Sequence, residues 1–134
     1  MPGMILRCIL IAVLAFLSAC DKPAGQAAPV GDHAALEQLA EAYRVTAQQF
    51  PVAVQGMKPE GKRQFVEQVF AHAGYDYPAT LAALAANLDA ANPDHRDLAE
   101  LLVLPRVGLA DDQLNGLYSS TEQQAIRALD AALQ

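Results

Sequence analysis

The sequence predicts an all-α protein, a single compact domain of five or six short helices over residues 33–134. Apolar residues in this range recur at spacings of three, four and seven, which is the period of helices with one buried face. No segment keeps the apolar–polar alternation of a half-buried strand, and β-branched residues are few. About 100 residues with one apolar stripe per helix can bury roughly 60–70% of the unfolded surface, which is enough for one core.

The first predicted helix covers about 33–50. Asp32 is its expected N-cap, and Pro51 ends it because proline cannot continue a helix. The apolar stripe of this helix consists of Leu36, Leu39, Tyr43 and Phe50. The segment that follows, VAVQGMKPEG, is expected to be a connector with room for a short extended piece.

A second helix is expected over about 59–73. Pro59 and Glu60 suit its first turn, and Gly74 suits its C-terminal end. Its buried face consists of Phe65, Val66, Val69 and Phe70. The third helix is expected to start near Pro78 behind a capping Asp76, and its inward residues are Leu81, Leu84 and Leu88.

The clearest helix start is Asn92-Pro93-Asp94, which combines a cap, a first-turn proline and a negative charge at the positive end of the helix dipole. The apolar stripe of this fourth helix, which ends before Pro105, consists of Leu98, Leu101 and Leu102. A short fifth helix is expected over about 111–118, with inward residues Leu114, Leu117 and Tyr118. The last helix opens with a capping box and buries Ala125, Ile126, Leu129 and Leu133.

Residues 1–19 have the three parts of an export signal. Arg7 supplies a positive charge, the apolar run CILIAVLAFL follows, and small residues precede Cys20. The run has about 10 residues, whereas a helix that spans a bilayer needs roughly 20. We therefore expect residues 1–19 to be a signal peptide.

The residues Leu17-Ser18-Ala19-Cys20 resemble the lipobox of bacterial lipoproteins. The resemblance implies that the Cys20 thiol receives a diacylglycerol, that the chain is cut just before Cys20, and that the new amine is acylated. The membrane would then be a partner through this lipid. The alternative is an ordinary secreted protein that is cleaved at a nearby alanine. No specific family is recognised for the domain that follows.

Residues 20–32 are expected to form the lipidated cysteine and a flexible tether, because DKPAGQAAPVGD has no apolar period. Twelve such residues span about 20 Å root-mean-square, so the domain would stand just off the membrane. Asp21 resembles the residue that retains lipoproteins in the inner membrane of enteric bacteria. We expect the periplasmic face of the inner membrane, and the outer membrane is the alternative.

Cleavage before Cys20 would leave 134 − 19 = 115 residues with 8 basic and 15 acidic side chains, a net charge of −7. That charge argues against nucleic acid as a partner and favours a basic protein. Because Cys8 would leave with the signal peptide and Cys20 would be alkylated, no thiol would remain. A disulfide, a thiolate nucleophile and a cysteine metal site are then excluded.

The stretch GMKPEGKR, residues 56–63, comes close to a phosphate-binding loop. Arg63, however, stands where that loop needs a hydroxyl to hold magnesium, so no nucleotide is expected. Ser119 and Ser120, the only serines after Cys20, are better used as helix caps. No set of nucleophile, base and acid stands out, and we expect the protein not to be an enzyme.

Asp94, His95 and Asp97 are candidate metal ligands. The two aspartates share a helix face, but His95 projects about 100° away from it, so a solvated helical turn is expected. His33 has no evident partner. We expect no metal and no other cofactor.

Tyr75, Asp76 and Tyr77 form a candidate partner surface; the alternative is an interhelix corner in which the tyrosine rings pack and Asp76 caps a helix. The expected function is that of a lipid-anchored, periplasm-facing envelope protein with a non-catalytic, protein-binding helical domain. An inhibitor or immunity-type factor is a sub-case. The alternative is a carrier of a small apolar ligand between helices, which needs a cavity of at least about 300 Å³.

Overall fold

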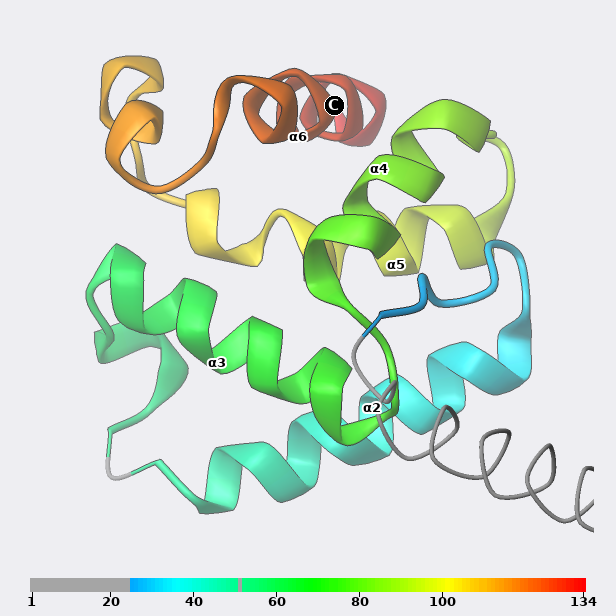
Figure 1. Cartoon of the computed structure of the whole chain (residues 1–134), viewed down its shortest axis with the longest axis horizontal. Helices are drawn as coiled ribbons and strands as arrows, with labels where there is room; N and C mark the ends of the chain where they lie inside the picture. Colours follow the sequence, from blue (N-terminus) through cyan, green and yellow to red (C-terminus); the bar gives the residue numbers. More distant parts are fainter. Residues whose placement is uncertain (1–24, 51) are drawn as a thin grey trace, which may run out of the picture.

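The computed structural model describes residues 25–50 and 52–134, and this part of the chain contains helices and no strand (Figure 1). The all-α prediction is confirmed. The α-helices are α2 (His33–Gln48), α3 (Pro59–His72), α4 (Tyr77–Asn87), α5 (Pro93–Leu102) and α6 (Ser120–Leu133). Three short 3₁₀ helices connect them: η1 (Val54–Gly56), η2 (Leu104–Arg106) and η3 (Asp111–Gly116). The predicted signal peptide, Cys20 and Asp21 lie outside the described residues.

Four helices begin directly after a residue that the sequence predicts as a cap. Each cap side chain accepts a hydrogen bond from a backbone N–H two or three residues further on, which satisfies a group that the helix itself leaves unpaired. The pairs are Asp32 with Ala34, Asp76 with Ala79, Asn92 with Asp94, and Ser119 with Glu122. The predicted capping box of α6 is complete, because the Glu122 carboxylate also accepts from the Ser119 N–H at 2.8 Å.

Two predicted elements differ from the structure. The helix expected over 111–118 is the 3₁₀ helix η3, which ends at Gly116. So short a segment gains too few hydrogen bonds to nucleate an α-helix, and glycine disfavours one further. The connector after α2 contains η1 rather than an extended piece.

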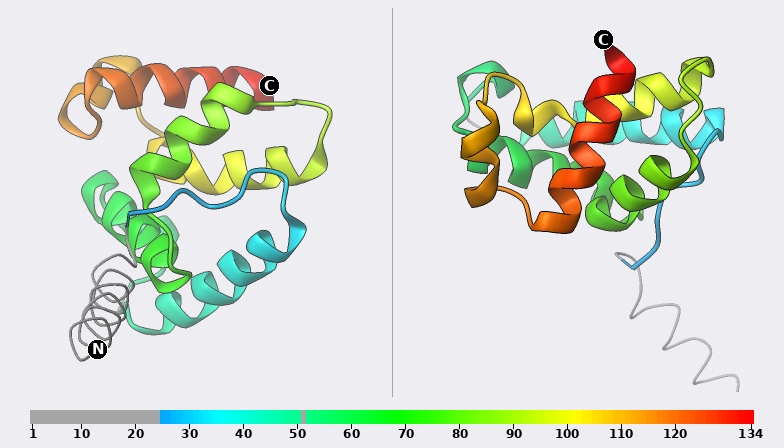
Figure 2. Two further views of the ribbon diagram at one scale, coloured as in Figure 1. Left: turned by 45° about the vertical axis from the view of Figure 1, so that its right-hand side comes forward. Right: turned by 90° about the horizontal axis from the view of Figure 1, so that it is seen from above.

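The helices cross at widely different angles instead of running side by side as in an up-and-down bundle (Figures 1 and 2). Helix α2 packs on α3, while α4 and α5 pack on α6, and η2 joins the two groups by lying against α3. The Phe65 ring of α3 meets Tyr43 and Phe50 edge to face, with ring centroids 5.1 and 5.3 Å apart. The predicted stripe of α3 is fully buried and forms the centre of the core.

Residues 26–30, named here the strap, lie along the start of α4. The Asp76 N–H donates to the Gln26 carbonyl at 2.7 Å, and the Ala28 N–H donates to the Thr80 hydroxyl at 2.9 Å. The Ala28 side chain is buried. This corrects the prediction of a tether that is flexible up to its junction with the first helix, because its second half belongs to the folded domain. The strap has no apolar period, so nothing in its sequence alone indicates that it packs on the domain.

Candidate functional site

The corner between α3 and α4 holds the three residues predicted as a partner surface. Tyr77 is 1% exposed, which corrects the expectation that it belongs to such a surface. The Asp76 carboxylate caps α4, and the Tyr75 hydroxyl donates to the Gln38 side chain at 3.1 Å. The three residues therefore form an interhelix corner, which is the alternative that the sequence allowed.

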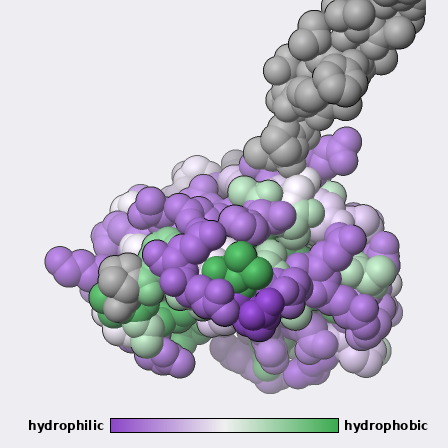
Figure 3. All heavy atoms as spheres, turned by 90° about the horizontal axis from the view of Figure 1, so that it is seen from below, coloured by the Kyte–Doolittle hydropathy of each residue, from purple (hydrophilic) through white to green (hydrophobic). Residues whose placement is uncertain are grey.

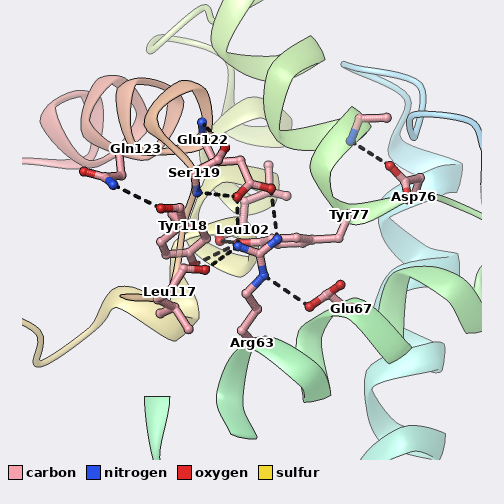
Figure 4. Close-up of polar contacts among 11 residues, drawn as sticks. Arg63, Glu67, Asp76, Tyr77, Leu102, Leu117, Tyr118, Ser119, Glu122 and Gln123 are labelled. Atoms are coloured by element: carbon pink, nitrogen blue, oxygen red, sulfur yellow. Dashed lines mark hydrogen bonds and ion pairs between the residues drawn. The ribbon is translucent and has the colours of Figure 1, made fainter. Parts of the chain in front are cut away.

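Behind Tyr77 lies a polar cluster centred on Arg63 (Figure 4). The Arg63 guanidinium donates to both carboxylate oxygens of Glu122, at 3.0 and 2.9 Å, and to the Leu117 carbonyl at 2.6 Å. Its Nε donates to Glu67 at 3.1 Å. A two-pronged pair of this kind is among the stronger hydrogen-bonded contacts in proteins.

Two tyrosine rings enclose this guanidinium. Its central carbon lies 4.8 Å from the Tyr118 ring centroid and 5.5 Å from that of Tyr77. The Tyr77 hydroxyl bonds to the Leu102 carbonyl and lies 3.1 Å from the Tyr118 hydroxyl. Burial raises the pKa of Tyr77 and raises the pKa of Tyr118 to about 12.

The Arg63 cluster joins α3 to the start of α6. The hydrogen bonds from Arg63 lower the pKa of the Glu122 carboxyl, so both partners stay charged at neutral pH. Within the described residues, the Arg63 guanidinium, the Glu122 carboxylate and the Tyr77 hydroxyl all have hydrogen-bond partners inside the domain. In the sequence, Arg63 is notable only because it occupies the position at which a phosphate-binding loop has a hydroxyl residue. No local pattern connects it to Glu122.

A second feature is a groove between α2 and α5 with a volume of about 420 Å³, named here the acidic groove. Its lining consists of His33, Leu36, Glu37, Leu39, Ala40, Tyr43, Asp97 and Leu101. Leu36, Tyr43 and Leu101 are only partly buried and give the groove an apolar floor. Glu37 and Asp97 stand on its two sides, and the face of the domain along α2 is mostly hydrophilic with small apolar areas between (Figure 3).

His33 closes one end of the acidic groove, which corrects the expectation that it has no partner. Its Nδ1 lies 3.1 Å from the Asp94 carboxylate, and its Nε2 lies 3.3 Å from that of Glu37. The hydrogen bond to Asp94, with the nearby negative charges of Asp94, Glu37 and Asp97, raises the pKa of His33. Within the described residues Asp97 forms no hydrogen bond or ion pair, so its charge is available to a partner.

Of the candidate metal ligands at the start of α5, Asp94 and Asp97 lie on the side of His33 and the acidic groove, and His95 lies on another side. Asp94 pairs with His33 and Asp97 lines the groove, whereas His95 is buried and its Nδ1 accepts from the Asp89 N–H at 2.9 Å. The burial of His95 corrects the expectation of a solvated turn at this position. No group of side chains suited to a metal ion gathers in the part of the chain that the structure describes.

A third feature is an open groove of about 460 Å³ between α4 and α6, named here the alanine groove. Its lining consists of Pro78, Leu81, Ala82, Ala85, Ala86, Thr121, Glu122, Gln124 and Ala125. Glu122 is the only ionisable residue in this lining, and its charge is paired with Arg63. The alanine groove is therefore apolar and lined by small side chains.

No protein-family model, curated protein or solved structure matches this chain. Among the described residues, no helix is both long enough and apolar enough to pass through a bilayer. Of the Arg63 cluster, the acidic groove and the alanine groove, the acidic groove combines exposed apolar surface with available charge.

Proposed function

We propose that this is a lipid-anchored protein of the cell envelope whose helical domain binds a basic protein in the acidic groove. The observation that carries the binding proposal is the half-exposed apolar floor between the carboxylates of Glu37 and Asp97. The anchor rests on the lipobox resemblance at Cys20 and on Asp21, which favours the periplasmic face of the inner membrane over the outer membrane.

The shape of the acidic groove suits a helix. Its α2 side extends from His33 to Tyr43, a separation of ten residue steps or about 15 Å of helix. An amphipathic helix can lay its apolar side chains on such a floor, a common mode of peptide recognition. Lysine or arginine residues beside that apolar stripe would meet the carboxylates on the two sides.

Charge also favours this partner at long range. The proposed mature chain carries 8 basic and 15 acidic side chains, and a field of this sign accelerates association with a cationic protein. An inhibitor or immunity-type factor that covers a basic surface fits the same geometry. Binding of this kind needs no catalytic group, and the proposed protein is not an enzyme.

A carrier of a small apolar ligand is the second candidate. The alanine groove exceeds the roughly 300 Å³ that such a site needs. Ligand sites, however, bury about 70–90% of their ligand, whereas this groove is open. Protein binding therefore has the stronger support.

Site-specific photocrosslinking in the native host tests the binding proposal. A photoreactive amino acid at Ala40, inside the acidic groove, should crosslink to a basic protein, and one at the exposed Ala110 should not. Asp97→Asn should reduce the crosslink at Ala40, while Glu100→Gln, an exposed carboxylate of α5 outside the groove lining, should leave it unchanged. Equal crosslinking from both positions would refute the groove as the site.

The anchor is tested separately with a palmitate analogue. The wild-type chain should incorporate the label, and Cys20→Ser should abolish incorporation because only a thiol accepts the diacylglycerol. Fractionation of the membranes for wild type and Asp21→Ser then shows which membrane holds the protein. Equal labelling of wild type and Cys20→Ser would refute the anchor and leave the binding proposal intact.

A further inference from the structure

We infer that the face formed by α4 and the first half of α6, with the alanine groove at its centre, rests on the surface of the bilayer. This inference rests on the lipid anchor of the proposed function and adds the orientation of the domain. Three observations support it: the strap joins the domain only a few residues after Cys20, the alanine groove lies on the same side as this junction, and that side of the domain carries little charge.

The strap limits the distance between the domain and the anchor. The hydrogen bond from Asp76 fixes Gln26 at the start of α4. Only 26 − 20 = 6 peptide units separate Gln26 from Cys20, and these reach at most about 20 Å when fully extended. A compact domain of about 110 residues has a radius of gyration near 13 Å, hence a diameter of roughly 30 Å, which exceeds this reach. The side that carries the start of the strap must stay close to the membrane.

The alanine groove lies on that same side. Seen from above, α4 and the first half of α6 lie on the side where the strap begins, and α2 and α5 lie on the other (Figure 2, right panel). An anchor at Cys20 therefore brings α4 and α6 to the bilayer. It leaves the acidic groove, between α2 and α5, on the side away from it.

The charge distribution favours this orientation. Helix α4, with the sequence YPATLAALAAN, has no charged residue, and the exposed groove residues Ala82, Ala86, Thr121 and Gln124 are uncharged as well. Asp97 and Glu100, whose carboxylates form no ion pair with any described residue, are on α5. Anionic headgroups repel carboxylates over about a Debye length, so an acidic domain held this close presents its uncharged face to them. The small side chains also allow headgroups to approach the helix backbones closely.

The occupant of this face is the headgroup layer of the protein's own membrane. No residue of the alanine groove is a large exposed apolar side chain of the kind that inserts into the acyl region. Contact at the headgroup level is therefore expected rather than insertion. A soluble partner then reaches the acidic groove without obstruction by the bilayer.

The test uses the full chain, purified with its lipid from the host membrane and reconstituted in phosphatidylethanolamine–phosphatidylglycerol nanodiscs. Ala86→Cys places one label on the alanine groove, and Ala40→Cys, a matched exposed alanine, places one in the acidic groove. With an environment-sensitive fluorophore on the cysteine and spin-labelled headgroups in the nanodisc, we expect at least twofold stronger quenching at position 86. Equal quenching, or stronger quenching at position 40, would overturn the inferred orientation.

The intact mass of the same samples separates the two proposals. A chain without acyl groups would refute the anchor and the orientation together, whereas an acylated chain with equal quenching would refute the orientation alone. A second variant tests contact rather than proximity. Adding Ala82→Glu to the Ala86→Cys protein should reduce the quenching at position 86, and unchanged quenching would overturn contact with the headgroups.

Discussion

The Arg63 guanidinium of α3 holds both carboxylate oxygens of Glu122, 59 positions further along the chain, at 3.0 and 2.9 Å. Glu122 is also the third residue of α6 and completes the capping box of that helix, because its carboxylate accepts from the Ser119 N–H. One carboxylate therefore completes the start of α6 and ties that helix to α3. Since the Tyr118 ring covers the guanidinium, the pair lies largely out of water.

Arg63→Ala should lower the free energy of unfolding by about 3 kcal/mol, because it leaves the Glu122 carboxylate partly buried without its cation. Arg44→Ala is the control: because the Arg44–Glu41 pair is exposed to water, its loss should lower the free energy of unfolding far less than Arg63→Ala does. Urea denaturation followed by circular dichroism measures both values. Similar losses in the two variants would contradict the structural role assigned to the Arg63 cluster.

The stability of the domain should fall at acidic pH partly through Glu122. Its folded-state pKa is lowered, first by the hydrogen bond from Arg63, so the folded chain binds this proton less readily than the unfolded chain. The contribution is present above the unfolded pKa of about 4.5 and is lost as the pH falls through the lower folded value. Denaturation between pH 6 and about pH 3 should therefore show a shallower decline in Glu122→Gln than in wild type. If the free energy of unfolding declines equally with pH in the two proteins, Glu122 does not contribute to this pH dependence. The control is Glu60→Gln, at an exposed carboxylate of α3.

The predictable parts of the structure are local in the sequence. Asn92 and Ser119 reveal helix starts because a cap acts within three residues. The Arg63–Glu122 pair could not be predicted, because it joins residues that only the packed fold brings together. The burial of His95 could not be predicted for a related reason: residues outside its helical turn cover it, with the Asp89 N–H donating to its Nδ1 and Gly31 lying close to its ring, while its own turn is highly charged. The acidic groove could not be predicted either, because residues of α2 and α5 form it together. The acidic composition predicted only that the partner is basic.

The strap should be sensitive to the Thr80 hydroxyl, which accepts from the Ala28 N–H and donates to the Asp76 carbonyl at 2.7 Å. Thr80→Val keeps the shape of the side chain but leaves a buried N–H without an acceptor, at a cost of about 1–2 kcal/mol. Hydrogen–deuterium exchange at Ala28 should accelerate in this variant. Thr121→Val, at an exposed position of α6, should change neither the free energy of unfolding nor the exchange rate at Ala28. Unchanged exchange at Ala28 in Thr80→Val would show that the strap does not depend on this bond.

His33 should titrate above its usual pKa of 6.5, chiefly because its ring bonds to Asp94. A raised folded-state pKa stabilises the domain below the unfolded pKa, and the effect is lost as the pH rises through the folded value. Imidazole resonances in a ¹H–¹⁵N NMR titration measure this pKa directly. Asp94→Asn should move it back toward 6.5, and Glu100→Gln should move it less. A His33 pKa that does not respond to Asp94→Asn would contradict the contact across the end of the acidic groove.

The acidic groove should bind a synthetic amphipathic helix of leucine and lysine through both its floor and its sides. Asp97→Asn should weaken this binding about threefold to tenfold, because the free carboxylate no longer attracts the peptide. Glu100→Gln carries the same change in net charge but lies outside the groove lining, and it should weaken binding less than Asp97→Asn does. Leu101→Ala should weaken binding at all salt concentrations, since it removes part of the apolar floor, whereas the loss in Asp97→Asn should shrink as salt screens the charges. Fluorescence anisotropy of the labelled peptide measures all four proteins. Equal losses in Asp97→Asn and Glu100→Gln would mean that the peptide senses only the net charge of the domain, and would contradict binding in the groove.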